Sequence, residues 1–141
     1  MGHIFFIAPN SDSNLDEIAE WTLYWLLEHN LVPDTAIYNC HNLRQALVAI
    51  EAPLAIGEPP ALIVLDHATP PQEETLLFAT KLHNCIPESW IVEITPRDMP
   101  LPHVQEHSFW IQKPVSEADW KAVLEHVFLK AGSPQWSATT L

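Results

Sequence analysis

The sequence predicts an α/β protein with a doubly wound, five-stranded parallel sheet and helices on both of its faces. Short apolar runs alternate along the chain with longer segments whose apolar residues recur at helical spacing. Such alternation favours parallel strands joined by right-handed crossover helices. The chain has 141 residues, of which 48% are hydrophobic, so it matches one domain that can bury a substantial core.

Five apolar runs are predicted to be strands, because each is short and bounded by polar residues or prolines. The most clearly defined run covers residues 61–65 and ends at Asp66. The other four runs cover residues 4–7, 36–38, 90–94 and 108–111.

Four helices are expected, over residues 15–30, 42–51 and 73–84 and after Ser116, which caps the last one. Ser13 or Asn14 is expected to cap the first helix. Prolines and a glycine in residues 53–60 predict a loop, and residues 97–106 predict at most a short helix. The expected inward positions are, in chain order, Leu15, Ile18, Thr22, Trp25 and Leu26; Leu43, Ala46, Leu47 and Ile50; Leu76, Leu77, Thr80 and His83; Trp120, Val123, Leu124, Val127 and Phe128.

The amino-acid composition indicates which classes of binding partner are not expected. Six basic residues against 18 acidic ones give a formal charge of −12, which repels nucleic acids and anionic membranes, so neither is an expected partner. No apolar run approaches the ~20 residues of a membrane span, and no signal peptide is recognisable. Cys40 and Cys85 are too few for a disulfide framework and indicate reduced thiols in the cytoplasm. We expect one domain over residues 1–130 and a tail over residues 131–141.

Three chemically useful residues end or follow neighbouring predicted strands: Asp66, Thr95 and Lys113. The carboxyl ends of parallel strands meet at one edge of a sheet, where such folds place their functional residues. A carboxylate there can attack phosphorus if a cation and a hydroxyl stabilise the product. The plainer alternative is a turn-capping Asp66 in a structural ion pair with Lys113. With only 3 glycines and no phosphate loop, GxSxG or HExxH motif, a stand-alone enzyme or a flavodoxin-like small-molecule binder is not expected.

Over about residues 4–130 the chain resembles the receiver domains of two-component response regulators. The resemblance is carried by residues 61–66 with Pro70 four residues on, by residues 91–95 and by residues 109–114. It implies a flavodoxin-like, receiver-type fold in which a histidine kinase or phosphotransfer protein phosphorylates Asp66 and the signal leaves through the last strand and helix. It also implies that Thr95 is the switch hydroxyl, that Lys113 precedes a cis proline, and that Trp110 is the switch aromatic residue.

The chain departs from receivers where they carry two adjacent acids after the first strand, because it has Ala8 and Pro9 there. Those acids normally hold Mg²⁺ with the phosphoacceptor, so we expect weak Mg²⁺ binding. Asn10 or Asp12 could join Asp66 as a ligand only if their loop folds back. The alternative function is therefore a degenerate receiver that acts as a phosphorylation-independent interaction or dimerisation module. A homodimer is expected through the face that contains Trp110.

Overall fold

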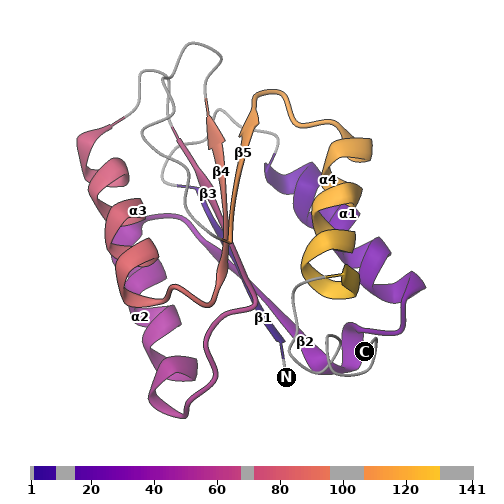
Figure 1. Ribbon diagram of the computed structural model, residues 1–141, viewed down its shortest axis with the longest axis horizontal. Coiled ribbons are helices and arrows are strands. Elements are labelled where there is room, and N and C mark those ends of the chain that lie inside the picture. Colours follow the sequence, from indigo (N-terminus) through magenta and orange to yellow (C-terminus); the bar gives the residue numbers. More distant parts are fainter. Residues whose placement is uncertain (1, 9–14, 68–71, 96–106, 131–141) are drawn as a thin grey trace.

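The computed structural model describes residues 2–8, 15–67, 72–95 and 107–130 (Figure 1). Five parallel strands form one sheet in the order β2-β1-β3-β4-β5, which is the flavodoxin-like order. The fold class predicted from the sequence is thereby confirmed. The strands are β1 (Gly2–Ile7), β2 (Thr35–Cys40), β3 (Leu62–Asp66), β4 (Trp90–Thr95) and β5 (Ser108–Gln112).

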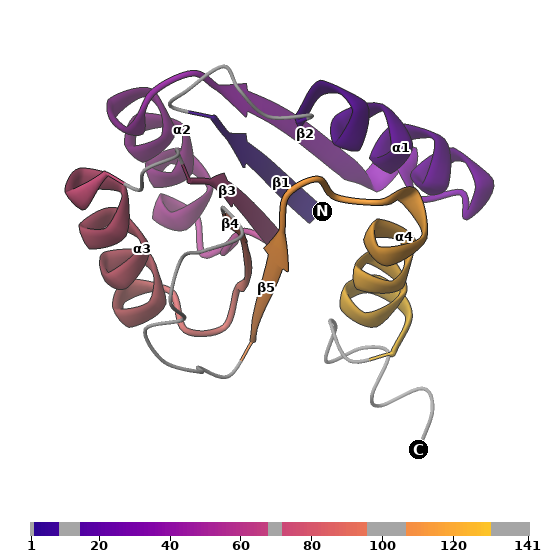
Figure 2. The same cartoon turned by 90° about the horizontal axis from the view of Figure 1, so that it is seen from above.

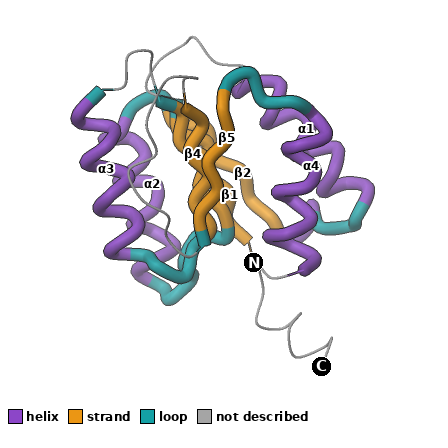
Figure 3. The backbone as a smooth tube through the Cα atoms, turned by 45° about the horizontal axis from the view of Figure 1, so that its top comes forward, coloured by secondary structure: helices purple, strands orange, loops and turns teal. Residues whose placement is uncertain are grey.

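Helices cover both faces of this sheet, as Figures 1 and 3 show. On one face lie α1 (Leu15–Glu28) and α4 (Glu117–Glu125), and on the other lie α2 (Leu43–Ala55) and α3 (Glu73–Cys85). A short 3-10 turn, η1 (Val32–Asp34), precedes β2, and a π-helical turn, η2 (His126–Lys130), extends α4. Within the described ranges, no helix has the length and apolar character needed to cross a bilayer.

Strand alternation divides the interior into two cores. Even-numbered residues of β3 and β4, such as Val64 and Val92, pack against α1 and α4. Odd-numbered ones, such as Ile63 and Ile91, pack against α2 and α3. All five residues of β3 are buried, as expected for a strand covered on both faces.

The helical pattern of α1 correctly predicted its buried face, since all five expected inward residues are buried. In the same core the Trp120 indole N–H of α4 donates to the Thr22 hydroxyl at 2.8 Å, and that hydroxyl donates to the Ile18 carbonyl at 2.7 Å. The predicted cap of α4 is also confirmed, because the Ser116 hydroxyl accepts from the Asp119 N–H at 3.2 Å. The expected caps Ser13 and Asn14 lie outside the described residues, as do residues 97–106 and 131–141.

Some local expectations for α2 and α3 were wrong. Helix α2 does not end before Pro53 but includes it in its last turn, and the Pro53 carbonyl accepts from the Glu58 N–H at 2.8 Å as the chain leaves the helix. Proline has no N–H to donate to the carbonyl four residues earlier, and the helix ends two residues after it. Helix α3 buries Thr75, Ala79, Leu82 and His83, whereas Leu77, expected to face inward, is 57% exposed. Thr80 on α3 and Leu47 on α2, also expected to face inward, are exposed as well, because each helix turns a neighbouring stripe toward the sheet.

Candidate functional site

The three residues singled out by the sequence gather at the carboxyl edge of the sheet. Asp66 is the last residue of β3, Thr95 is the last residue of β4, and Lys113 directly follows β5. The register places Asp66 beside Ile94, and Thr95 beside Gln112. These parallel pairings bring the three strand ends level with one another.

Asp66 and Lys113 form an ion pair across this edge. The Lys113 Nζ lies 3.3 Å from Asp66 Oδ1 and 3.5 Å from Oδ2. The Asp66 side chain is fully buried, while that of Lys113 is 16% exposed, so water screens the pair only weakly. An unpaired carboxylate at such a position is strongly unfavourable, and Lys113 supplies a compensating charge. The Lys113–Pro114 peptide is cis, as the resemblance implied.

Thr95 is buried and is linked to Lys113 through the backbone. Its carbonyl accepts a hydrogen bond from the Lys113 N–H at 2.9 Å. Since Ile94 is the register neighbour of Asp66, alternation places the Thr95 side chain on the opposite face of the sheet. Across the residues described, no hydrogen bond joins the Thr95 hydroxyl to Asp66. The structure therefore brings Thr95 to the site by its main chain.

Figure 2 shows the edge strand β5 beside α4. Trp110 lies on β5 and lines a groove between this strand and α4. The groove has a volume of about 780 Å³, and its lining includes Thr95, Trp110, Lys113, Asp119, Val123 and His126. The indole Nε1 of Trp110 is buried and has no hydrogen-bond partner in the described part of the chain. The groove thus connects the predicted switch aromatic residue with the ion pair.

The described residues do not fit a Mg²⁺ site. Mg²⁺ needs several oxygen ligands in near-octahedral geometry, usually including more than one carboxylate or a substrate phosphate. Asp66 is a single carboxylate already paired with Lys113, and Ala8, after β1, offers no side-chain oxygen. No group of three His, Cys, Asp or Glu residues within the described ranges could hold a metal ion. The other suggested ligands, Asn10 and Asp12, lie outside those ranges.

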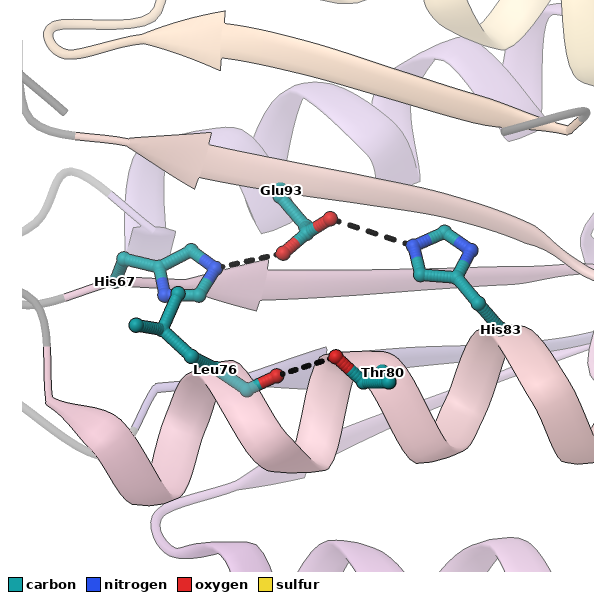
Figure 4. A network of polar contacts seen from close by, with 5 residues as sticks. All are labelled: His67, Leu76, Thr80, His83 and Glu93. Atoms are coloured by element: carbon teal, nitrogen blue, oxygen red, sulfur yellow. Dashed lines mark hydrogen bonds and ion pairs between the residues drawn. The ribbon is translucent and has the colours of Figure 1, made fainter. Parts of the chain in front are cut away.

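A buried polar cluster that the sequence did not predict lies on the other face of the same edge (Figure 4). His67 Nε2 lies 2.8 Å from Glu93 Oε1, and His83 Nε2 lies 3.3 Å from Glu93 Oε2. Burial alone would raise the pKa of Glu93, but hydrogen bonds from His67 and His83, together with the charges of these rings, hold it below its ordinary value of 4.5. A glutamate within the apolar run of β4 was the available signal.

The geometry therefore offers two chemically distinct features at the carboxyl edge. One is the Asp66–Lys113 pair, which combines an acidic oxygen with a cation. The other is the cluster of Glu93 and its two histidines on the opposite face. The chain matches no protein-family model and no curated protein.

Proposed function

We propose that the chain is a receiver-type signalling domain of a two-component or phosphorelay system. In this proposal Asp66 accepts a phosphoryl group from a histidine kinase or phosphotransfer protein in the cytoplasm. The observation that carries the proposal is the Lys113 ammonium 3.3 Å from the buried Asp66 carboxylate, at the carboxyl edge of a sheet with the order β2-β1-β3-β4-β5. The same fold hosts many functions, so it is this ion pair that supports the proposed function.

The chemistry asked of these residues is simple. A carboxylate oxygen of Asp66 attacks phosphorus, the phosphorus–nitrogen bond of the phosphohistidine breaks, and the released imidazole keeps the electron pair and takes up a proton. Lys113 then neutralises charge on the new phosphoryl group, and Thr95 supplies a hydroxyl donor when the edge rearranges. Since Asp66 is fully buried, transfer requires this edge to open first.

The pair also suggests a route by which the signal leaves the site. Lys113 follows β5 directly, and the groove that it lines reaches α4. Phosphorylation would convert the Asp66 carboxylate into an acyl phosphate, so the Lys113 ammonium would turn from the former carboxylate to the phosphoryl oxygens and shift the segment between β5 and α4. Trp110 on β5 lines the same groove.

A second candidate is a degenerate receiver that never takes phosphate. It is favoured by Ala8, which replaces an acid, and by the misfit of the described residues to Mg²⁺. In this case the Asp66–Lys113 pair is a fixed structural element, and the groove beside Trp110 is an interaction surface. We propose a homodimer through that surface in either case.

Intact-mass measurement after incubation with acetyl phosphate and Mg²⁺ separates the two candidates. The leading proposal expects one added phosphoryl mass on the wild type and none on Asp66→Asn. Asp119→Asn is the matched control, because Asp119 is an exposed acid that lines the same groove, and it should label like the wild type. If none of the three proteins is labelled, or if Asp66→Asn is labelled, the result favours the degenerate receiver.

A further inference from the structure

The Glu93 cluster occupies a position where an apolar side chain would be expected. Alternation along β4 places Glu93 on the same face as Ile91, in the core made with α2 and α3. Glu93 is 1% exposed, His67 is fully buried and His83 is 9% exposed. A carboxylate in such surroundings is tolerated only when it is hydrogen-bonded, so the two imidazole contacts are necessary to this core.

The hydrogen-bonding pattern shows which nitrogen of the His67 ring donates to Glu93. Both Glu93 oxygens accept, because the depressed pKa of this residue keeps it ionised, so the His67 hydrogen lies on Nε2. The other ring nitrogen, Nδ1, is buried and has no partner in the described part of the chain. The ring therefore contacts the carboxylate through Nε2, with the hydrogen of that nitrogen directed at Glu93.

His67 is tied to β4 twice, one residue after Asp66. Its backbone N–H donates to the Ile94 carbonyl at 2.9 Å, and its ring donates to Glu93 at 2.8 Å. Strand alternation then directs the Asp66 side chain to the opposite face, where it meets Lys113. Any rotation of the chain at His67 would therefore move the Asp66 carboxylate relative to the Lys113 ammonium.

His83 completes the arrangement from α3. Its Nε2 reaches the second oxygen of Glu93, so the carboxylate is held between the end of β3 and the helix that covers it (Figure 4). The other buried polar side chains that α3 and β4 contribute to this face in the described part are Thr75 and Thr95, which are uncharged. Lys81 on α3 is exposed, and so are Arg44 and Glu51 on α2.

We propose that Glu93 is a positioning residue for Asp66, because by holding the His67 ring it fixes the end of β3 and the direction in which Asp66 meets Lys113. The functional meaning of this inference rests on the proposed role of Asp66. Its test reads the geometry of Asp66 and not phosphoryl transfer. The inference and the proposed function can therefore fail separately.

The test follows the side-chain carboxyl carbon of Asp66 by ¹³C NMR in the 141-residue chain. Glu93→Met removes both acceptor oxygens, and we expect it to displace the Asp66 resonance. Glu93→Gln keeps a carbonyl acceptor for His67 and should restore the resonance close to its wild-type position. The matched control is Thr22→Val, which breaks a buried polar contact in the core of α1 and α4, across the sheet from Glu93, and should leave the Asp66 resonance unchanged. An unmoved Asp66 resonance in folded Glu93→Met, or an equal displacement in Thr22→Val, would overturn the proposal.

A double-mutant cycle tests whether the effect passes through His67. In a His67→Leu background, adding Glu93→Met should displace the Asp66 resonance no further. Additive displacements of the resonance would contradict the proposal. If Glu93→Met does not fold, the variants His67→Gln and His67→Leu test the same hydrogen bond from its other end. Glutamine keeps a donor for Glu93, whereas leucine does not. The Asp66 resonance should then stay near its wild-type position in His67→Gln and move in His67→Leu. Equal displacement of this resonance in both variants would refute the positioning role of Glu93. A displaced Asp66 in Glu93→Met together with an unphosphorylatable wild type would refute the proposed function alone.

Discussion

Lys113 and Asp66 lie 47 residues apart in the sequence, yet the Lys113 Nζ is 3.3 Å from the Asp66 Oδ1 in the folded chain. The contact depends on β4, which lies between β3 and β5 and sets the distance between their ends. It also requires both strands to end at the same level of the sheet. This ion pair can therefore form only when the carboxyl ends of β3, β4 and β5 are correctly aligned.

Removing the cation from this pair should destabilise the protein. Lys113→Met leaves the buried Asp66 carboxylate without its Lys113 partner, at a cost of about 3 kcal/mol in the free energy of unfolding. Urea denaturation measures this loss. Lys121→Met is the matched control, because Lys121 pairs with Glu117 at 3.0 Å on the exposed face of α4 and should change stability little. Equal effects of the two substitutions would contradict the importance assigned to the buried pair.

The stabilisation contributed by Glu93 should depend on pH in a defined direction. Its pKa is lowered in the folded protein by the two histidine contacts, so the contribution is present above the ordinary value of 4.5 and is lost as pH falls through the folded pKa. The difference in unfolding free energy between wild type and Glu93→Gln should accordingly be larger well above pH 4.5 than well below it. Denaturation across this range gives the profile. Exposed Glu51→Gln controls for the loss of one acid, and an identical profile for both variants would contradict the assignment.

The two cysteines should differ in reactivity. Cys40 is 3% exposed and burial raises the pKa of its thiol above 9.0, whereas Cys85 is exposed. Iodoacetamide near neutral pH should therefore modify native protein at Cys85, with Cys40 reacting only after unfolding. Peptide mass mapping of wild type and Cys85→Ser checks the site. Rapid labelling of Cys40 in the native protein would show that the core under β2 is open.

The buried contact between Trp120 and Thr22 should contribute measurably to stability. Thr22→Val preserves the shape of the side chain but leaves the buried Trp120 N–H without its acceptor, at a cost of about 1–3 kcal/mol. Thr22→Ser keeps the hydroxyl and should cost less. The midpoint of urea denaturation distinguishes these variants. A valine variant as stable as wild type would show that the indole N–H finds another acceptor.

The proposed homodimer should tighten as salt increases, because a formal charge of −12 opposes association and salt screens that repulsion. Analytical ultracentrifugation at low and moderate salt should detect this, and Trp110→Ala should weaken the dimer. Leu77→Ala, at an exposed apolar residue on α3 rather than at the groove, should not. A wild type that is monomeric at every salt concentration, or a dimer indifferent to Trp110, would refute this interface.

The fold was predictable because its signals are local. The run that ends at Asp66 is apolar at every position before that residue. A short run of this kind is typical of a strand that is covered on both faces. The periodicity of α1 was equally clear, from Leu15 to Leu26. The inward face of α3 was not predictable in this way. Leu77 lies outward while His83 lies inward, because the partner that His83 meets is Glu93 on β4.

By itself, the sequence determined the order of strands and helices and the residues that end each strand, since both follow from patterns within a few neighbouring positions. Only the tertiary structure decided which of those residues meet. The His83, His67 and Lys113 contacts join residues 10, 26 and 47 positions apart, and they depend on strand order, register and alternation between faces. Alternation separates Asp66 from His67, its neighbour in the chain, so one edge carries an ion pair on one face and a hydrogen-bonded carboxylate on the other.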